Sequence, residues 1–184
     1  LGATGWEPEE IRGEIRKVRA LTDRPFAVDL LLPASLAEAD VPREEVRQLV
    51  EREHPAHWRF VESLYERFGV DRSLKHPQVW ALSPTLMKQQ AEVVLEERVP
   101  VLVSGLGDPA WIVPLAHEAG IKVKGLVGAP RHAERQVQAG VDYVIAQGTE
   151  AGGHTGTIAT LALVPQVVDQ VAPTPVVAAG GIAD

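Results

Sequence analysis

The chain has 184 residues and no cysteine, which excludes disulfide bonds, thiolate metal sites and a cysteine nucleophile. Its formal net charge of −7 argues against a nucleic-acid binder, because such a protein needs a basic face. With 45% hydrophobic and 23% charged residues, the composition is that of a globular protein, and the length suits one domain.

The sequence shows no sign of a membrane or export segment. No apolar run approaches the roughly 18 residues that a spanning helix needs. The first six residues lack both the basic and the apolar region of a signal peptide. Because no initiator Met is present, we expect that the start of the protein is missing, and a cytoplasmic location is the default expectation.

Strands and helices are predicted to alternate along the chain. Short apolar runs bounded by Gly or Pro predict buried parallel strands at residues 26–32, 99–104, 121–127, 141–147 and 175–179. Helices are expected at 8–21, 84–97, 109–119, 130–139 and 157–171, with Asp108 as the cap of the third and Pro109 at its first position. A doubly wound sheet and a (β/α)8 barrel both show this alternation, and periodicity does not separate them.

Residues 33–83 interrupt this alternation. The segment is charged and is predicted to be helical at 44–53 and 58–68. An apolar stripe at helical spacing supports the second of these helices. The stripe consists of Trp58, Phe60, Val61, Leu64 and Phe68. We therefore expect a helical insert over one end of the sheet.

The glycine-rich segment 146–156 directly follows a predicted strand. In a parallel α/β protein this position is the carboxyl edge of the sheet, where ligands bind. Glycines let the backbone approach a ligand closely, and His154 among them can exchange a proton near neutral pH. A flexible turn with an exposed histidine is the alternative interpretation.

Two further glycine segments follow predicted strands. Residues 178–182 contain paired glycines whose free N–H groups could bind a phosphate, although a plain tight turn explains the spacing equally well. Residues 104–108 could cover one face of a ligand, or could form a simple strand-to-helix turn capped by Asp108. This segment does not match the dinucleotide-binding G-x-G-x-x-G pattern.

The other histidines offer weaker signals. His54 and His57 are close enough in sequence to suggest a metal site, but Pro55 breaks the helix that would align them, and no metal is expected. The remaining histidines are interpreted as surface or packing residues. They are His76, His117 and His132.

The strings AQGTEAGGHTG and VVAAGGIAD together resemble the nitronate monooxygenase family, formerly 2-nitropropane dioxygenases, which are FMN-dependent (β/α)8 enzymes. The similarity extends through GLVGAPRHAERQVQAGVDYVIAQG and PFAVDLLLP. The resemblance implies an incomplete TIM barrel, from about strand 2 or 3 to strand 7. Residues 1–184 would then form a single FMN-binding barrel fragment, with 33–83 as a helical insert.

The resemblance also implies where the flavin ring would lie. His154 would sit over the reactive edge of the flavin, as the catalytic acid or base or as a substrate-positioning residue. Gly152 and Gly153 would pass their backbone close to the ring, and Gln147 would line the same face. Leu126 occupies a place from which the family contacts the flavin, through its main chain.

The same resemblance places the cofactor's phosphate at the end of the last predicted strand. Ala179, Gly180 and Gly181 would hold it through backbone N–H groups. Asp29 falls where relatives usually have Asn. An ionised Asp accepts hydrogen bonds but cannot donate one, so its contact with the cofactor would differ.

The implied reaction is the FMN-dependent oxidation of alkyl nitronates or nitroalkanes by O2 to a carbonyl compound and nitrite. The closest alternative is an NADH-dependent FMN reductase of a quinone or an enoyl-ACP. A second alternative is a non-catalytic flavin-binding fragment. The expected partners are the small-molecule substrate and O2, with no nucleic acid and no membrane; a homo-oligomer is compatible with the sequence.

Overall fold

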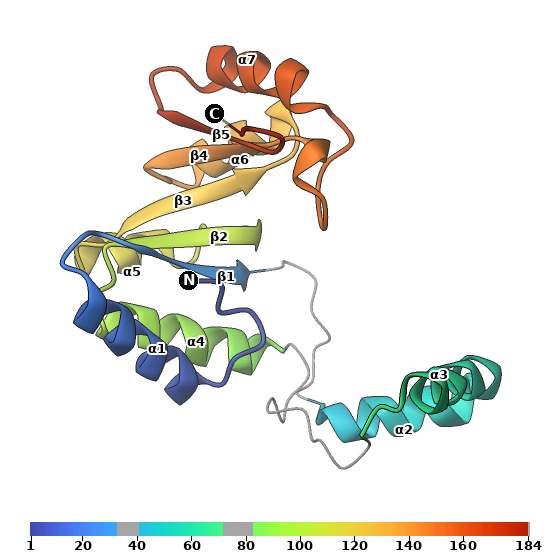
Figure 1. The fold of residues 1–184 in the computed structure, drawn as a ribbon. Helices are drawn as coiled ribbons and strands as arrows, with labels where there is room; N and C mark the ends of the chain where they lie inside the picture. The colour runs from blue at the N-terminus through green and yellow to red at the C-terminus, as the bar shows by residue number, and fades with distance from the viewer. Residues whose placement is uncertain (33–40, 72–82, 184) are drawn as a thin grey trace.

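The computed structural model describes residues 1–32, 41–71 and 83–183, and Figure 1 shows their arrangement. The helices are α1 (Pro8–Leu21), α2 (Arg43–Glu53), α3 (Pro55–Phe68), α4 (Pro84–Glu96), α5 (Val113–Glu118), α6 (Pro130–Gln138) and α7 (Thr160–Val171), with a short 3-10 helix η1 (Thr149–Ala151). The strands are β1 (Ala27–Leu32), β2 (Val101–Gly107), β3 (Lys122–Val127), β4 (Tyr143–Gln147) and β5 (Val176–Ala179).

The described residues form a five-stranded parallel sheet in the order β1-β2-β3-β4-β5. A doubly wound sheet reverses its strand order at a switch point, whereas each strand here pairs with the next one along the chain. Sequential parallel strands connected by helices are the arrangement of a (β/α)8 barrel. The expected α/β fold is therefore confirmed, and the alternative of a doubly wound sheet is removed.

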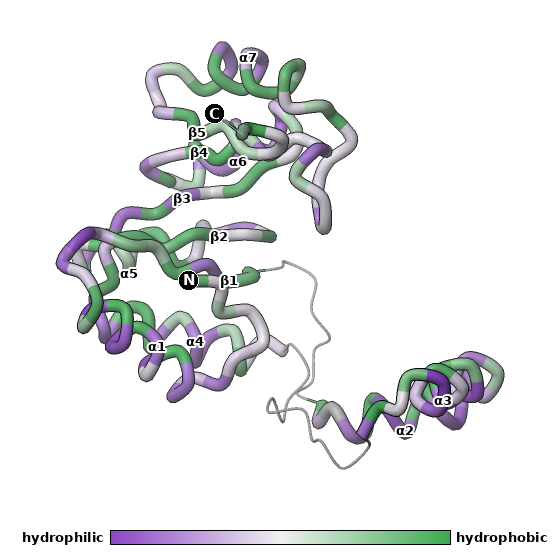
Figure 2. Tube along the Cα trace, viewed as in Figure 1, coloured by the Kyte–Doolittle hydropathy of each residue, from purple (hydrophilic) through white to green (hydrophobic). Residues whose placement is uncertain are grey.

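The core lies between one face of the sheet and the helices. Along β1 the side chains alternate, with Val28, Leu30 and Leu32 fully buried and the residues between them half-buried. From α1, the residues Ile11 and Ile15 complete this part of the core. Figure 2 shows hydrophobic residues along the strands and more hydrophilic ones on the outer helices. The alternation along β1 fits a barrel strand, whose successive side chains face the helices and the barrel interior in turn.

An ion-pair network connects α1 to the end of α4. The Glu97 carboxylate accepts from Arg12 at 3.2 Å, from Arg16 at 3.0 Å and from Arg19 at 2.7 Å. Burial by itself would raise the pKa of Glu97, but hydrogen bonds from Arg12 and Arg16 outweigh it and lower that pKa. The network connects α1 to α4, which packs against β1.

Two predicted boundaries differ from the structure. Helix α5, predicted at 109–119, begins at Val113 rather than at Pro109. Pro114 has no N–H group that could donate to the carbonyl of residue 110 and continue the helix backwards. Asp108 still accepts a hydrogen bond from the Ala110 amide at 2.9 Å. Helix α7, predicted at 157–171, begins at Thr160 rather than at residue 157. The loop before it is held by a hydrogen bond from the Thr149 amide to the carbonyl of residue 158.

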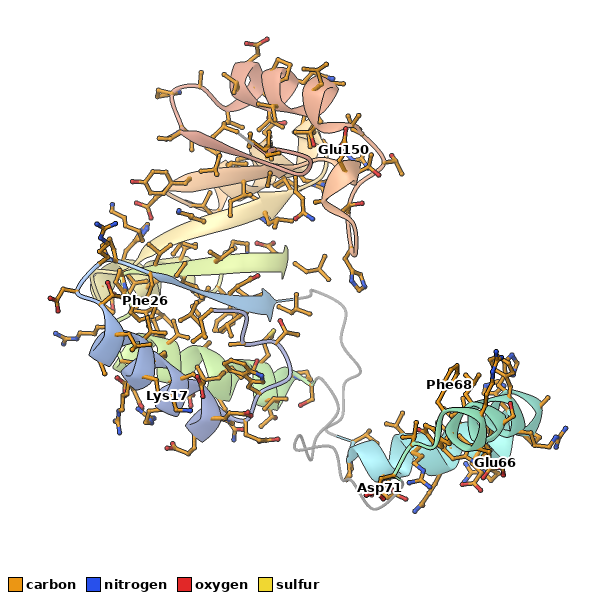
Figure 3. The ribbon with its side chains drawn as sticks, viewed as in Figure 1. Lys17, Phe26, Glu66, Phe68, Asp71 and Glu150 are labelled. Carbon is orange, nitrogen blue, oxygen red and sulfur yellow. The ribbon has the colours of Figure 1, made fainter. Side chains whose placement is uncertain are left out.

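Helices α2 and α3 pack against each other as a hairpin, which Figure 1 shows apart from the sheet. Both helices were expected within the insert, although α3 begins earlier, at Pro55. The Phe60 and Phe68 side chains of the predicted apolar stripe are mostly exposed, and Figure 3 labels Phe68. Residues 33–40 and 72–82 of the insert, and with them His76, lie outside the described residues.

No helix within residues 1–32, 41–71 and 83–183 is both long and apolar enough to cross a membrane.

Candidate functional site

The carboxyl ends of β2, β3 and β4 surround a cavity of about 520 Å3. Figure 1 shows that the loop after β4 lies at the carboxyl edge of the sheet, where the strand arrows end. The cavity is lined by Gly105, Leu106, Gly107, Asp108, Leu126, Gly128, His132, Arg135, Gln136, Gln147, His154, Thr155 and Gly156. The site therefore lies at the edge of the sheet where the strand pattern predicted it.

The structure brings three of the predicted site residues into this cavity. Leu126 comes from β3, Gln147 is the last residue of β4, and His154 lies in the loop that follows β4. Leu126 and Gln147 occupy half-buried positions on their strands, on the face opposite the buried core residues. An imidazole, a carboxamide and an aliphatic side chain thus share one ligand-sized space.

The predicted glycine turns lie beside the cavity rather than in its wall. Gly152 and Gly153 have positive φ values of 72° and 66°. The turn after β5 contains Gly180 and Gly181, with φ values of 102° and 68°, a conformation that glycine adopts readily. The Gly148 amide donates to the Ala179 carbonyl at 3.0 Å, so the β4 loop and the β5 turn are in direct contact.

The N–H groups of the two glycines in the β5 turn, Gly180 and Gly181, have no backbone partner among the described residues. Successive free N–H groups in a glycine turn form a concave donor site that suits phosphate.

Sequence reasoning missed a group of side chains on α6. His132, Arg135 and Gln136 line the same cavity as His154, a position that the sequence did not predict for any of them. Burial, together with the charges of Arg131 and Arg135, lowers the pKa of His132. His132 lies in the first turn of α6, so only the packing of this helix after β3 brings it to the cavity.

Gln136 and Arg135 have different surroundings. Gln136 is only 7% exposed and donates to the Gly107 carbonyl at 2.9 Å, which fixes α6 against the end of β2. Arg135 is exposed and forms no ion pair with another described residue. Its guanidinium is therefore free to attract an anion that enters the cavity.

Asp29 lies on β1 beside Gly105, which lines the cavity, but Asp29 itself is not part of the wall. Burial raises the pKa of Asp29. Its Oδ1 atom is buried and has no hydrogen-bond partner among the described residues. A carboxyl group in these surroundings is easier to protonate than an exposed one, and the protonated form can donate a hydrogen bond.

The family model described as nitronate monooxygenase matches residues 1–184, which is the whole chain. The chain belongs to the nitronate monooxygenase family. This result agrees with the resemblance that the glycine motifs indicated.

Individual relatives support membership of the nitronate monooxygenase family. A Mycobacterium tuberculosis protein named as a monooxygenase is 37% identical over 193 residues, which cover 100% of this chain and 51% of that protein. The probable nitronate monooxygenase of Staphylococcus haemolyticus is 32% identical over 196 residues, covering 100% of this chain and 50% of that protein. The chain thus spans about half the length of the relatives it matches.

Two solved structures are similar to this chain in fold and sequence. Nitroalkane oxidase from Streptomyces ansochromogenes is 28% identical with a TM-score of 0.75, covering 99% of this chain and 50% of that one. FabK from Thermotoga maritima is 29% identical with a TM-score of 0.66, covering 97% of this chain and 41% of that one.

Proposed function

We propose that the protein containing this chain uses FMN and O2 to oxidise alkyl nitronates or nitroalkanes to a carbonyl compound and nitrite. The observation that carries the proposal is the meeting of His154, Gln147 and Leu126 in one cavity, beside a glycine turn with free N–H groups. Membership of the nitronate monooxygenase family and the similarity to a nitroalkane oxidase support the same reaction class.

The residues present fit a phosphorylated flavin. Nitronate monooxygenases are flavoproteins. The cavity volume of about 520 Å3 lies within the usual range for cofactor and ligand sites. Leu126 and Gln147 would contact the ring, and the Gly180 and Gly181 N–H groups would hold the phosphate. Residues 1–184 would act as one FMN-binding unit, with 33–83 as its insert.

The side chains have distinct proposed roles. Bound FMN would supply the redox chemistry, accepting electrons from the substrate and passing them to O2. His154 would donate a hydrogen bond to the nitro or nitronate oxygens. Arg135 would attract the negatively charged nitronate into the cavity.

A general base is needed only for a neutral nitroalkane, because a nitronate has already lost its α-proton. His132 suits this role, since its lowered pKa keeps the imidazole neutral and able to accept a proton at pH 7. The nearby Arg135 would stabilise the nitronate anion that forms. His154 remains the proposed positioning donor for both substrate forms.

Anaerobic mixing of the purified full-length protein with a nitronate tests the proposal. The protein should carry FMN, and a nitronate should bleach the visible absorbance of the oxidised flavin, while NADH should leave it oxidised. Bleaching by NADH but not by nitronate would replace this proposal with the reductase alternative. Bound FMN that neither compound bleaches would indicate the non-catalytic flavin binder.

A further inference from the structure

Glu150 and Thr160 connect the two glycine segments of the site. The Glu150 Oε2 atom accepts a hydrogen bond from the Thr160 backbone amide at 2.8 Å and lies 2.9 Å from the Thr160 hydroxyl. That hydroxyl also lies 2.8 Å from the Gly180 carbonyl oxygen. Figure 3 labels Glu150 at the edge of the sheet below α7. One carboxylate and one hydroxyl therefore join the β4 loop, the start of α7 and the β5 turn.

Glu150 also satisfies the amino end of α7. Ala159, the residue before the helix, has no side chain that can accept a hydrogen bond from the first turn. The Glu150 carboxylate takes that place, and the Thr160 amide lowers the pKa of Glu150. The Thr160 amide is thus occupied by the chain itself, whereas the amides of the β5 turn stay free.

Thr160 is buried at this junction, whereas Glu150 is exposed and is held by its hydrogen bonds to Thr160. Thr160 is only 7% exposed. A Cβ atom at Gly180 would lie 2.9 Å from the Thr160 hydroxyl oxygen, and one at Gly181 would lie 3.1 Å from the Glu150 Cβ atom. The position of the β5 turn therefore depends directly on where Glu150 and Thr160 lie.

We propose that Glu150 and Thr160 are positioning residues, which hold the Gly180–Gly181 turn at a fixed place relative to the His154 loop. This inference rests on the proposed function, in which the ring lies beside the loop and the phosphate lies on the turn. The two residues then determine whether one FMN molecule can contact both ends of the site at once. Riboflavin, which lacks the phosphate, does not need the turn.

The test compares FMN and riboflavin binding to the full-length protein after flavin removal. Thr160→Val removes the hydroxyl while keeping the side-chain shape, and we expect it to weaken FMN binding roughly tenfold, as for a lost buried hydrogen bond. Riboflavin binding should change by less than about twofold, because only the phosphate end is disturbed. Thr160→Ser, the matched control, retains the hydroxyl and should bind both flavins nearly as the unaltered protein does.

Glu150→Gln provides a second variant if Thr160→Val fails to fold. Its amide can still accept from the Thr160 N–H group but carries no charge, so we expect a smaller loss, again confined to FMN. The 31P resonance of bound FMN should shift in both variants, since the phosphate environment changes.

Three results would overturn the inference. Equal weakening of both flavins would show that the two residues merely support the fold. Unchanged binding of both flavins, or tighter FMN binding in Glu150→Gln, would show that they do not position the turn. An unaltered full-length protein that binds neither flavin would instead refute the proposed function itself.

Discussion

Gly128 and Gly156 meet backbone to backbone where the loops after β3 and β4 come together. A Cβ atom at Gly156 would lie 2.3 Å from the Gly128 carbonyl oxygen, and one at Gly128 would lie 2.7 Å from the Gly156 amide nitrogen. Both residues line the cavity. This contact holds the loop that carries His154 against the loop that leads to His132.

Gly156→Ala should therefore destabilise the protein and loosen the site. A methyl group cannot fit at this contact, so the loops must separate, at a cost of roughly 1–3 kcal/mol. The urea midpoint of the full-length protein should fall, and flavin affinity should fall with it. Gly13→Ala is the control, because Gly13 lies in α1 with open space around it and alanine there favours the helix by roughly 0.5–1 kcal/mol. Equal midpoints for the two variants would contradict the contact.

The two histidines of the cavity should respond differently to substitution. His132→Asn should lower kcat/KM for a neutral nitroalkane by about a hundredfold and leave nitronate turnover nearly unchanged, because only the nitroalkane needs a base. His154→Asn should lower turnover of both substrates, because it removes a donor to the nitro group. Steady-state rates with both substrates measure this difference. If His154→Asn alone abolished nitroalkane turnover, the base would be His154.

The pH dependence of nitroalkane turnover should report His132. Since its pKa is lowered, the imidazole stays neutral and active as a base until the pH falls below the ordinary histidine range. The rate should then drop as the pH falls through the lowered pKa and the ring gains a proton. A nitronate should not show this loss, and His132→Asn should remove it for the nitroalkane. An identical acid loss with both substrates would rule out the assignment.

Arg135→Gln should raise KM for a nitronate by roughly threefold to tenfold, the effect of losing one charge-assisted contact. The KM for a neutral nitroalkane should change little. Arg131→Gln removes the same charge from a neighbouring exposed residue outside the cavity wall and serves as the matched control. Added salt should weaken nitronate binding to the unaltered protein more than to Arg135→Gln, because salt screens this attraction. Equal KM values in both variants would contradict the role of Arg135.

Much of the fold could be predicted because its signals are local. The helix at Pro8–Leu21 was predicted with both boundaries, since a proline begins it and Ile11 and Ile15 repeat at helical spacing. The strand runs were found because they are short, apolar and bounded by Gly or Pro. The order of strands in the sheet does not depend on local sequence. The choice between a doubly wound sheet and a barrel therefore needed the structure, in which each strand from β1 to β5 pairs with the next.

The site was predicted only in part, because several of its contacts join residues that are distant in the sequence. His154 stands out among glycines, but His132 lies in an ordinary amphipathic helix whose first turn faces the cavity only after folding. The Glu150–Thr160 contact joins residues ten positions apart and reaches Gly180, twenty positions further along. Sequence spacing does not show such contacts, because they depend on neighbouring strands that bring their loops together.

The most direct measurement is the structure of the full-length protein with FMN bound. We predict that a single FMN places its ring against Leu126, Gln147 and His154 while its phosphate accepts hydrogen bonds from the backbone of Gly180 and Gly181. A phosphate bound elsewhere, or a ring outside this cavity, would contradict the account.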